Sequence, residues 1–287
     1  MRSARSLSEN PGQIRPDLSS ERLSTLLGSS PHCRAFGLSP RQGGDADEVA
    51  FILPARPAHR IAAGEDIWHP GAIGSAMDSL LSIGALATVE RGSRPATIDL
   101  RMDLFARVAL NDLLCQANVA QVGRGVVYSH GAIIDTKSGV QVGSGSATVA
   151  MAPPTDSGIG DTDAGEAEAR EASELCEWLD LEMDDDGIAS VPYRVGLGGA
   201  AGYPFWHGGA LTAAMLAAAT ARANREAPGL RLATATASFD LFAVDAPVIL
   251  DTKEWRATRT RLSVYVPCAQ DGRGVTSRLA AHFIKDR

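Results

Sequence analysis

The sequence predicts an α+β protein built from two tandem copies of one domain, each an antiparallel sheet wrapped around a long central helix. Three observations lead to this prediction. Short sequence matches recur at a nearly constant separation along the chain. In each copy, a long segment that is apolar nearly all round follows a Trp-His pair. Segments of alternating β-type residues follow each apolar segment, and a curled sheet would cover most faces of such a helix.

The repeat consists of three ordered matches. The hexapeptide WHPGAI, which contains His69, recurs as WHGGAL, which contains His207, at a separation of 138 residues. The tetrapeptide DLFA begins at Asp103 and again at Asp240, 137 residues later. The turn DTKSGV at 135–140 recurs loosely as QDGRGV, 135 residues later. A slowly drifting separation indicates a duplicated unit of roughly 130 residues with small deletions.

The repeat defines the expected domain boundaries. We expect an N-terminal domain over 18–151 and a C-terminal domain over 164–287. Residues 152–163 (APPTDSGIGDTD) are rich in Pro, Gly, Asp and Thr, which is typical of a linker. Residues 1–17 have no apolar core, and we expect them to be flexible and not a secretory signal.

The elements are expected in the same order in both copies. A leading helix covers Ser20–Leu27 in the first copy and Gly165–Leu179 in the second. A strand follows, near 48–53 and near 187–193. The central helix covers Gly71–Val89 and then Gly208–Asn224. Strands are expected after the first central helix at 96–104, 113–121, 126–135 and 140–151, with counterparts in the second copy.

Composition restricts the class of protein. Of 287 residues, 45% are hydrophobic and 21% are charged, as in ordinary soluble globular proteins. A net charge of −7 argues against nucleic acid as a partner. The four cysteines lie far apart with no C-x-x-C pair, which is typical of reduced cytosolic thiols and not of a disulfide framework or a metal site. The segment 71–89 contains Asp78 and several Gly and Ser residues, so we expect a buried helix there and no membrane span. These features predict a cytoplasmic protein.

The histidine tetrads, the acid inside the first central helix and the strands that follow resemble hotdog-fold thioesterases of the phenylacetic-acid-degradation (PaaI) type. In the first copy the resemblance includes His69-Pro70-Gly71-Ala72, Asp78, the strand ATIDL that contains Thr97, and the turn QVGRG at 121–125. In the second copy it includes WHGGA at 206–210 and FDLF at 239–242. The resemblance implies an acyl-CoA thioesterase that needs no cofactor beyond the CoA thioester, which is its substrate.

Asp78 is the first candidate for catalysis. It is the one charged residue in about five turns of apolar helix, and a buried carboxylate is costly unless it is paired or used. Pairing with Ser75, Ser79 or Ser82 would give it a purely structural role. The resemblance instead implies a nucleophile or a general base at this position, and these two roles stay open. It also implies that Thr97 supplies a hydroxyl that orients water.

The start of each central helix is the second candidate feature, because its free N–H groups and positive dipole end suit a developing oxyanion. In related thioesterases the N–H directly after the histidine polarises the thioester carbonyl. This position is Pro70 in the first copy, which has no N–H, and Gly208 in the second, which has one. We expect His69, His207 and Gly209 to lie in the substrate-binding region, where the histidines orient loops.

One helix cannot supply both parts of the site. Asp78 follows Pro70 by eight residues, which is about 12 Å along a helix, whereas an attacked carbonyl must lie about 3 Å from both acid and donor. The position equivalent to Asp78 in the second copy is Leu216, which cannot act as acid or base. We therefore expect one composite site, formed by Asp78 of the first copy and Gly208 of the second.

Several expectations stay open. Arginines near the sheet edges would meet the phosphates of CoA, and Arg124 and Arg259 are the candidates, although each is also typical of a solvated face. An asparagine found upstream of the histidine in some relatives is replaced here by Ala63 and Ala201. This departure favours the alternative of a catalytically silent hotdog pair that binds acyl-CoA or another acyl ligand. By analogy with tetrameric relatives, we expect a homodimer that forms a pseudo-tetramer of hotdog units, with a trimer of chains as the other option.

Overall fold

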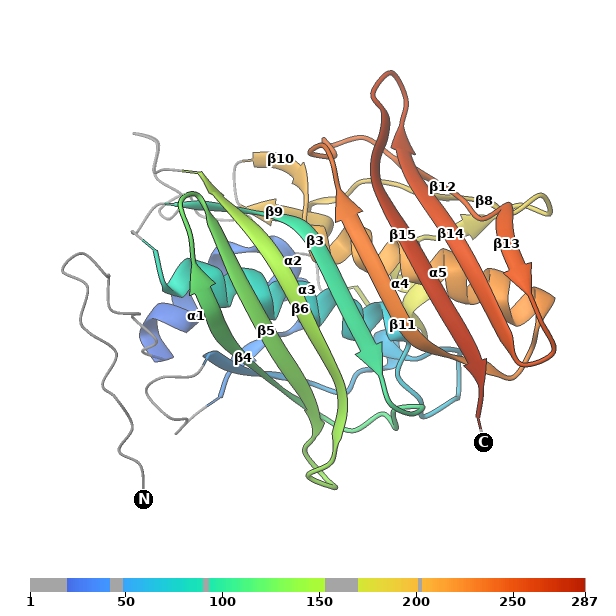
Figure 1. The fold of residues 1–287 in the computed structure, drawn as a ribbon, viewed down its shortest axis with the longest axis horizontal. Coiled ribbons are helices and arrows are strands. Elements are labelled where there is room, and N and C mark those ends of the chain that lie inside the picture. Colours follow the sequence, from blue (N-terminus) through green and yellow to red (C-terminus); the bar gives the residue numbers. More distant parts are fainter. Residues whose placement is uncertain (1–19, 42–48, 90–92, 153–169, 201–202, 287) are drawn as a thin grey trace, which may run out of the picture.

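The computed structural model describes the whole chain except residues 1–19, 42–48, 90–92, 153–169, 201–202 and 287. Its main feature is one 13-stranded antiparallel sheet (Figure 1). In spatial order the strands are β1 (Ser39–Pro40), β2 (Val49–Leu53), β4 (Leu113–Val122), β5 (Val126–Asp135), β6 (Gln141–Ala152), β3 (Arg94–Leu104), β11 (Leu230–Phe239), β15 (Gly274–Lys285), β14 (Arg261–Gln270), β12 (Val248–Asp251), β8 (Ile188–Val191) and β7 (Glu182–Met183), with β13 (Glu254–Ala257) paired to β14.

The sheet has the same strand order on both sides of its centre. The central pair is β3 with β11, and Leu100 faces Ala237 across it. Outward from this pair, β6 corresponds to β15, β5 to β14, β4 to β12, β2 to β8 and β1 to β7. The sequence predicts two separate sheets, whereas the structure joins them into one. Pairing of β3 with β11 covers the edge strand that each half would otherwise expose.

Two long helices lie on the same side of the sheet (Figure 1). They are α3 (Pro70–Ala87) and α5 (Gly208–Glu226), whose ends lie within two residues of the predicted helices. Each begins at a histidine, because the ring Nδ1 of the N-cap residue accepts a hydrogen bond from the N–H two residues later. All but one of the α3 residues are buried, as their apolar character predicts.

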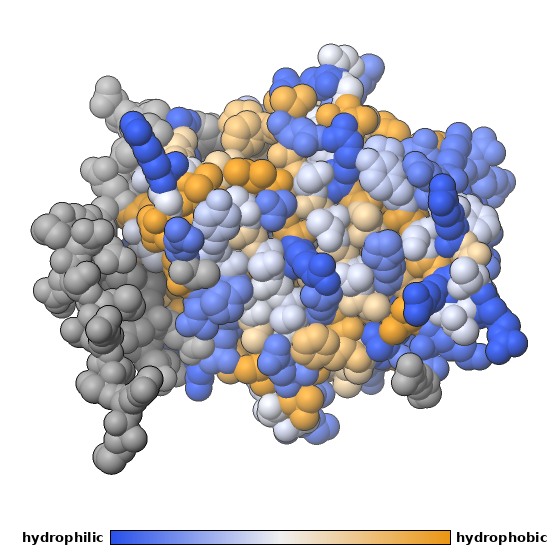
Figure 2. All heavy atoms as spheres, in the orientation of Figure 1, coloured by the Kyte–Doolittle hydropathy of each residue, from blue (hydrophilic) through white to orange (hydrophobic). Residues whose placement is uncertain are grey.

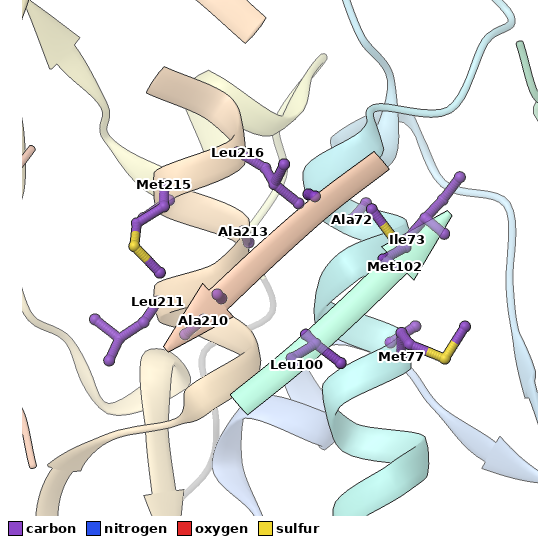
Figure 3. Packing of buried hydrophobic residues seen from close by; sticks show 14 of the residues in the cluster. Ala72, Ile73, Met77, Leu100, Met102, Ala210, Leu211, Ala213, Met215 and Leu216 are labelled. Atoms are coloured by element: carbon purple, nitrogen blue, oxygen red, sulfur yellow. The ribbon is translucent and has the colours of Figure 1, made fainter. Parts of the chain in front are cut away.

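Small residues allow α3 and α5 to pack closely and antiparallel. A β-carbon built on Gly71 would lie 2.8 Å from the carbonyl oxygen of Ala213, and one built on Gly74 would lie 2.7 Å from Leu216 Cδ1. Real β-carbons do not approach other atoms so closely, so Gly71 is required by the backbone of α5, and a side chain at Gly74 would force Leu216 to shift. Figure 3 shows Leu216 of α5 pointing toward α3, where Met77 and Met102 also pack. This contact brings the start of each helix against the body of the other.

The smaller elements differ in part from the prediction. The first leading helix is observed as α1 (Ser20–Ser29), followed by α2 (Pro31–Phe36). The expected helix over Gly165–Leu179 is wrong for residues 170–174, because only α4 (Leu175–Leu179) is helical there, and 165–169 lie outside the described residues. This last part carries the buried side chains Leu175, Trp178 and Leu179, whereas residues 170–174 contribute only the partly buried Ala172. The preceding residues lack an apolar stripe that packing could stabilise.

Further short elements precede each long helix. They are η1 (Pro57–His59), η2 (Val195–Leu197), and a hairpin of β9 (Gly198–Ala200) and β10 (Tyr203–Trp206). The expected flexible segment 1–17 and residues 153–163 of the expected linker lie outside the described residues. Within the described part of the chain, no helix has both the length and the apolar character needed to cross a membrane.

Candidate active site

Asp78 lies in the middle of α3 and is 1% exposed. Its Oδ1 accepts a hydrogen bond of 2.7 Å from the hydroxyl of Thr97 on β3. The hydroxyl of Ser82 lies 3.1 Å from Thr97 Oγ1 and donates to it, because the Thr97 proton is already directed to Asp78. The serine nearest in sequence, Ser79, donates to the carbonyl of Ser75 instead. The structure therefore pairs the carboxylate with a strand hydroxyl, not with a serine of its own helix.

The carboxylate also lies against the first turn of α5. A β-carbon built on Gly208 would lie 2.8 Å from Asp78 Oδ2 and 3.1 Å from Oδ1, so the backbone of Gly208 touches the acid. The N–H of Gly209 faces the same carboxylate. The N–H groups of a first turn have no acceptor within the helix, and the positive dipole end points the same way. Acid and helix start thus meet across the α3–α5 contact.

Burial and hydrogen bonds act in opposite directions on the acid. Burial raises the pKa of Asp78 to about 6, while the hydrogen bonds from Thr97 and Gly209 work against this rise. The ring of His207 lies close, with Nδ1 at 3.6 Å from Asp78 Oδ2. Burial lowers the pKa of His207 to about 4, and its Nδ1 accepts the Gly209 N–H at 2.9 Å. His207 is therefore neutral near pH 7 and forms no ion pair with Asp78.

The start of α3 is capped by a histidine in the same way as the start of α5, but no acid lies against it. His69 Nδ1 accepts from the N–H of Gly71 at 2.9 Å, as His207 does from Gly209. Pro70 has no N–H to offer, and Leu216 stands at the position equivalent to Asp78. The hydroxyl of Thr220, which is equivalent to Ser82, is buried and lacks a hydrogen-bond partner. We refer to this region, formed by Pro70, Leu216 and Thr220, as the acid-free side.

A small cavity opens on the acid-free side. Its lining is mainly apolar and includes Ile73, Leu104, Leu232, Phe283 and Thr220. The corresponding network on the other side, Asp78 with Thr97 and Ser82, is fully bonded. The two sides therefore share their backbone construction and differ in their polar groups.

The structure brings together some of the expected site residues and separates others. Thr97, His207, Gly208 and Gly209 surround Asp78. His69 is 1% exposed and caps α3 on the acid-free side.

The two expected arginines are exposed on hairpin turns. Arg124 lies between β4 and β5, and Arg259 lies between β13 and β14. Neither has a contact with Asp78 among the interactions of the described residues.

Sequence reasoning missed one residue, His32 of α2, which is fully buried and stacks on the ring of His207. A comparison of PHCRAFGL at 31–38 with ELCEWLDL at 174–181 would have revealed it, because Leu175 stands where His32 does. Within the described residues, no three His, Cys, Asp or Glu side chains come together as a metal site would require.

Comparisons with known proteins agree on the type of fold. The thioesterase superfamily model matches residues 65–141, which contain α3, β3, β4 and β5. No curated protein matches the chain.

Three solved structures resemble most of the chain. A protein of Thermobifida fusca assigned as a thioesterase II has 11% identity and a TM-score of 0.60, covering 90% of this chain and 100% of that one. An acyl-ACP thioesterase of Bacteroides thetaiotaomicron has 15% identity and a TM-score of 0.53, covering 83% and 98%. The 12:0-ACP thioesterase of Umbellularia californica has 11% identity and a TM-score of 0.56, covering 85% and 100%. The chain thus has a hotdog-type thioesterase fold.

Proposed function

We propose that this protein hydrolyses acyl-CoA thioesters at one composite site, formed by Asp78 of α3 and the first turn of α5. The superfamily match and the thioesterase neighbours support thioester hydrolysis in general. The observation that carries the proposal is the contact between the Asp78 carboxylate and the backbone of Gly208. A base and an oxyanion donor must both lie close to one carbonyl, and this contact supplies both from two helices.

In the proposed reaction, the N–H of Gly208 donates to the thioester carbonyl oxygen, and the dipole of α5 stabilises the negative charge that develops there. Ionised Asp78 removes a proton from a water molecule, whose oxygen attacks the carbonyl carbon. The carbon–sulfur bond then breaks, the carboxylic acid is released, and the thiolate takes up a proton. Direct attack by the carboxylate through an anhydride gives the same products, and both routes need Asp78 ionised.

The environment of Asp78 suits a general base or a nucleophile. A pKa of about 6 leaves the group mostly ionised near pH 7, yet more basic than an ordinary carboxylate. Thr97 holds one carboxylate oxygen, which leaves Oδ2 directed at the start of α5. Since the acid is 1% exposed, a substrate must displace neighbouring groups to reach it.

We further propose that the two halves are tandem copies of one hotdog domain, and that two chains associate into a pseudo-tetramer. The matching strand order and the matching histidine caps support the duplication. Phe105 and Phe242, from the repeated tetrapeptide, are 51% and 58% exposed and offer apolar surface for association. A sedimentation mass of one chain would contradict the dimer, and a mass of three would indicate a trimer.

Release of free thiol from a panel of thioesters tests the activity. The panel should contain short, medium and long aliphatic acyl-CoAs, an aryl acyl-CoA, and acyl chains on an acyl carrier protein, because two structural neighbours act on the latter. Hydrolysis of CoA thioesters that requires Asp78 supports the proposal. Ligand-induced thermal stabilisation without thiol release would instead support a silent acyl-binding protein.

A further inference from the structure

His32 is a buried polar residue beside the proposed site, on an element that precedes both central helices. It lies in α2 and is fully buried. Its Nε2 lies 2.6 Å from the hydroxyl oxygen of Ser75 on α3, and its Nδ1 lies 3.3 Å from the carbonyl oxygen of Gly196. Its ring stacks on that of His207, with centroids 4.6 Å apart and an interplanar angle of 29°.

These contacts fix the hydrogen-bond roles. A carbonyl oxygen can only accept, so Nδ1 of His32 carries the proton and donates to Gly196. Burial holds the pKa of His32 well below its usual value, so the ring is neutral and its Nε2 accepts from the Ser75 hydroxyl. His32 is therefore held in one tautomer by two bonds, from α3 on one side and from η2 on the other.

The ring of His207 is also held by two neighbours. Its Nδ1 accepts the Gly209 N–H, and its ring rests on the fixed ring of His32. Ser75 also touches the same turn, because a β-carbon built on Gly209 would lie 3.1 Å from Ser75 Oγ. One packed unit, formed by Ser75, His32 and His207, thus surrounds the first turn of α5. This turn faces Asp78.

The acid-free side lacks this unit. The left-handed residues Gly37 and Asp180 follow α2 and α4 with the same pattern of backbone hydrogen bonds, and this alignment places Leu175 at the position of His32. A β-carbon built on Gly71 would lie 2.9 Å from Leu175 Cδ2, at the start of α3. The equivalent of Ser75 is Ala213.

On the acid-free side, where Leu216 corresponds to Asp78, the residues that correspond to His32 and Ser75 are apolar too. A buried histidine and a buried serine are not needed for packing at this place, since leucine and alanine pack there in the other half. Their presence on the acid-bearing side alone points to the chemistry of that side.

We propose that His32, oriented by Ser75, is a positioning residue that fixes the ring of His207 and through it the first turn of α5 opposite Asp78. This role rests on the proposed thioesterase function, but it can be tested without turnover. His32 takes no part in bond making in this proposal, because both of its ring nitrogens are engaged, Nδ1 with the Gly196 carbonyl and Nε2 with the Ser75 hydroxyl.

The decisive variant is His32→Leu with Ser75→Ala, which copies the residue pair of the acid-free side and is therefore expected to fold. With ¹⁵N-labelled histidine, wild-type His207 should give the two ring shifts of a single tautomer, protonated at Nε2. In the double variant these shifts should move toward the values of exchanging tautomers. Unchanged His207 shifts would overturn the positioning role, whatever the activity.

The second measurement is the kcat of the variants. The double variant should lower kcat for the best acyl-CoA of the panel by about 10–100-fold, the order of loss that follows from misplaced catalytic groups. In a His207→Asn background, where asparagine can still cap α5, the same two changes should have little further effect on kcat. If the two changes lowered kcat by the same factor in the His207→Asn background as in the wild type, action through His207 would be contradicted.

Leu175→Met is the matched control, because it alters the equivalent buried position on the acid-free side and should leave kcat within about twofold. Asp78→Asn separates the two proposals. Full activity of Asp78→Asn would contradict the thioesterase mechanism, whereas an inactive Asp78→Asn with a fully active double variant would contradict only the role of His32.

Discussion

Leu100 and Ala237 face each other across the β3–β11 pair, and their separation of 137 residues is the same as that of the repeated DLFA segments. Leu100 and Ala237 therefore occupy corresponding positions, one in each half of the chain. The pairs on either side follow the same rule, since Asp99 faces Ser238 and Arg101 faces Thr236. An approximate twofold axis thus passes through this pair, and it relates the Asp78 site to the acid-free side.

Asp78→Asn should remove turnover and preserve the fold. The amide keeps the size of the carboxylate but can neither accept a proton nor attack a carbonyl, so kcat should fall by at least 10²–10⁴-fold. Leu216→Asn at the equivalent position is the control. It should leave turnover nearly intact while lowering the free energy of unfolding by about 1–3 kcal/mol. Thiol release measures the first effect and chemical denaturation the second. Wild-type turnover in Asp78→Asn would exclude the proposed site.

The pH dependence of stability should reveal the buried acid. The folded-state pKa of Asp78 is raised from the ordinary value of 3.8 to about 6, so the group is protonated in both folded and unfolded chains well below pH 4. As the pH rises from 4 to 6, the unfolded chain ionises first and stability is lost. Relative to Asp78→Asn, the wild type should lose about 3 kcal/mol across this window and remain constant above it. Denaturation curves of both proteins at several pH values test this, and parallel profiles would contradict it.

Thr97→Val should move the acidic limb of kcat/KM. The wild-type value should rise with pH around a midpoint of about 6, as Asp78 ionises. The Thr97 hydroxyl stabilises the ionised carboxylate, so its removal should shift the midpoint to higher pH and lower the rate at pH 6. The control is Thr234→Val, which removes the hydroxyl of another strand threonine, one that bonds Asp103 and not Asp78. A midpoint that stays in place would show that Thr97 does not act on the carboxylate.

Gly208→Ala should displace the acid. The added β-carbon would lie 2.8 Å from Asp78 Oδ2, closer than real β-carbons approach an oxygen, so the carboxylate or the helix start must shift. A loss of about 10²-fold in kcat is expected, the order that a misplacement of about 1 Å produces. In an Asp78→Asn background, Gly208→Ala should cost little more, since the base is already absent. Equal fractional losses in both backgrounds would indicate a general effect on α5.

Thr220→Val should stabilise the protein. The Thr220 hydroxyl is buried without a partner, and the adjoining cavity is mainly apolar, so valine removes an unsatisfied polar group at nearly constant volume. The expected gain in the free energy of unfolding is about 1 kcal/mol. Ser82→Ala at the equivalent position should instead lower it by about 1 kcal/mol, since Ser82 is bonded to Thr97. A destabilised Thr220→Val would mean that the hydroxyl is satisfied, for example by a water.

The sequence predicts the long helices and the composite site because each depends on strong local signals. The Trp-His pairs mark the helix starts, and the eight-residue spacing from Pro70 to Asp78 requires a second helix. Thr97, which the resemblance implies as a water-orienting hydroxyl, donates to Asp78 in the structure, and its action on water stays a prediction. The rest depends on tertiary packing. The joining of the two sheets follows from one strand pair, and α4 is short because residues 170–174 contribute only the partly buried Ala172 to the core.

His32 could not be recognised from its own surroundings in the sequence, because what distinguishes it is contact with Ser75 and His207, 43 residues away and in the other half. Arg124 and Arg259 lie on exposed hairpin turns, and their role toward the phosphates of CoA stays a prediction. The face of the molecule seen in Figure 2 mixes hydrophilic and hydrophobic side chains.

The continuous sheet also has a consequence for how such a protein can evolve. In an assembly of identical subunits, every substitution appears in all copies, so loss of the acid would abolish every site at once. When β3 and β11 join two unequal halves in one chain, each half accumulates changes separately. The half without the acid has the buried residues Leu216, Leu175 and Ala213 where the other half has Asp78, His32 and Ser75. Because both halves belong to one chain, every molecule carries this difference between them in the same arrangement.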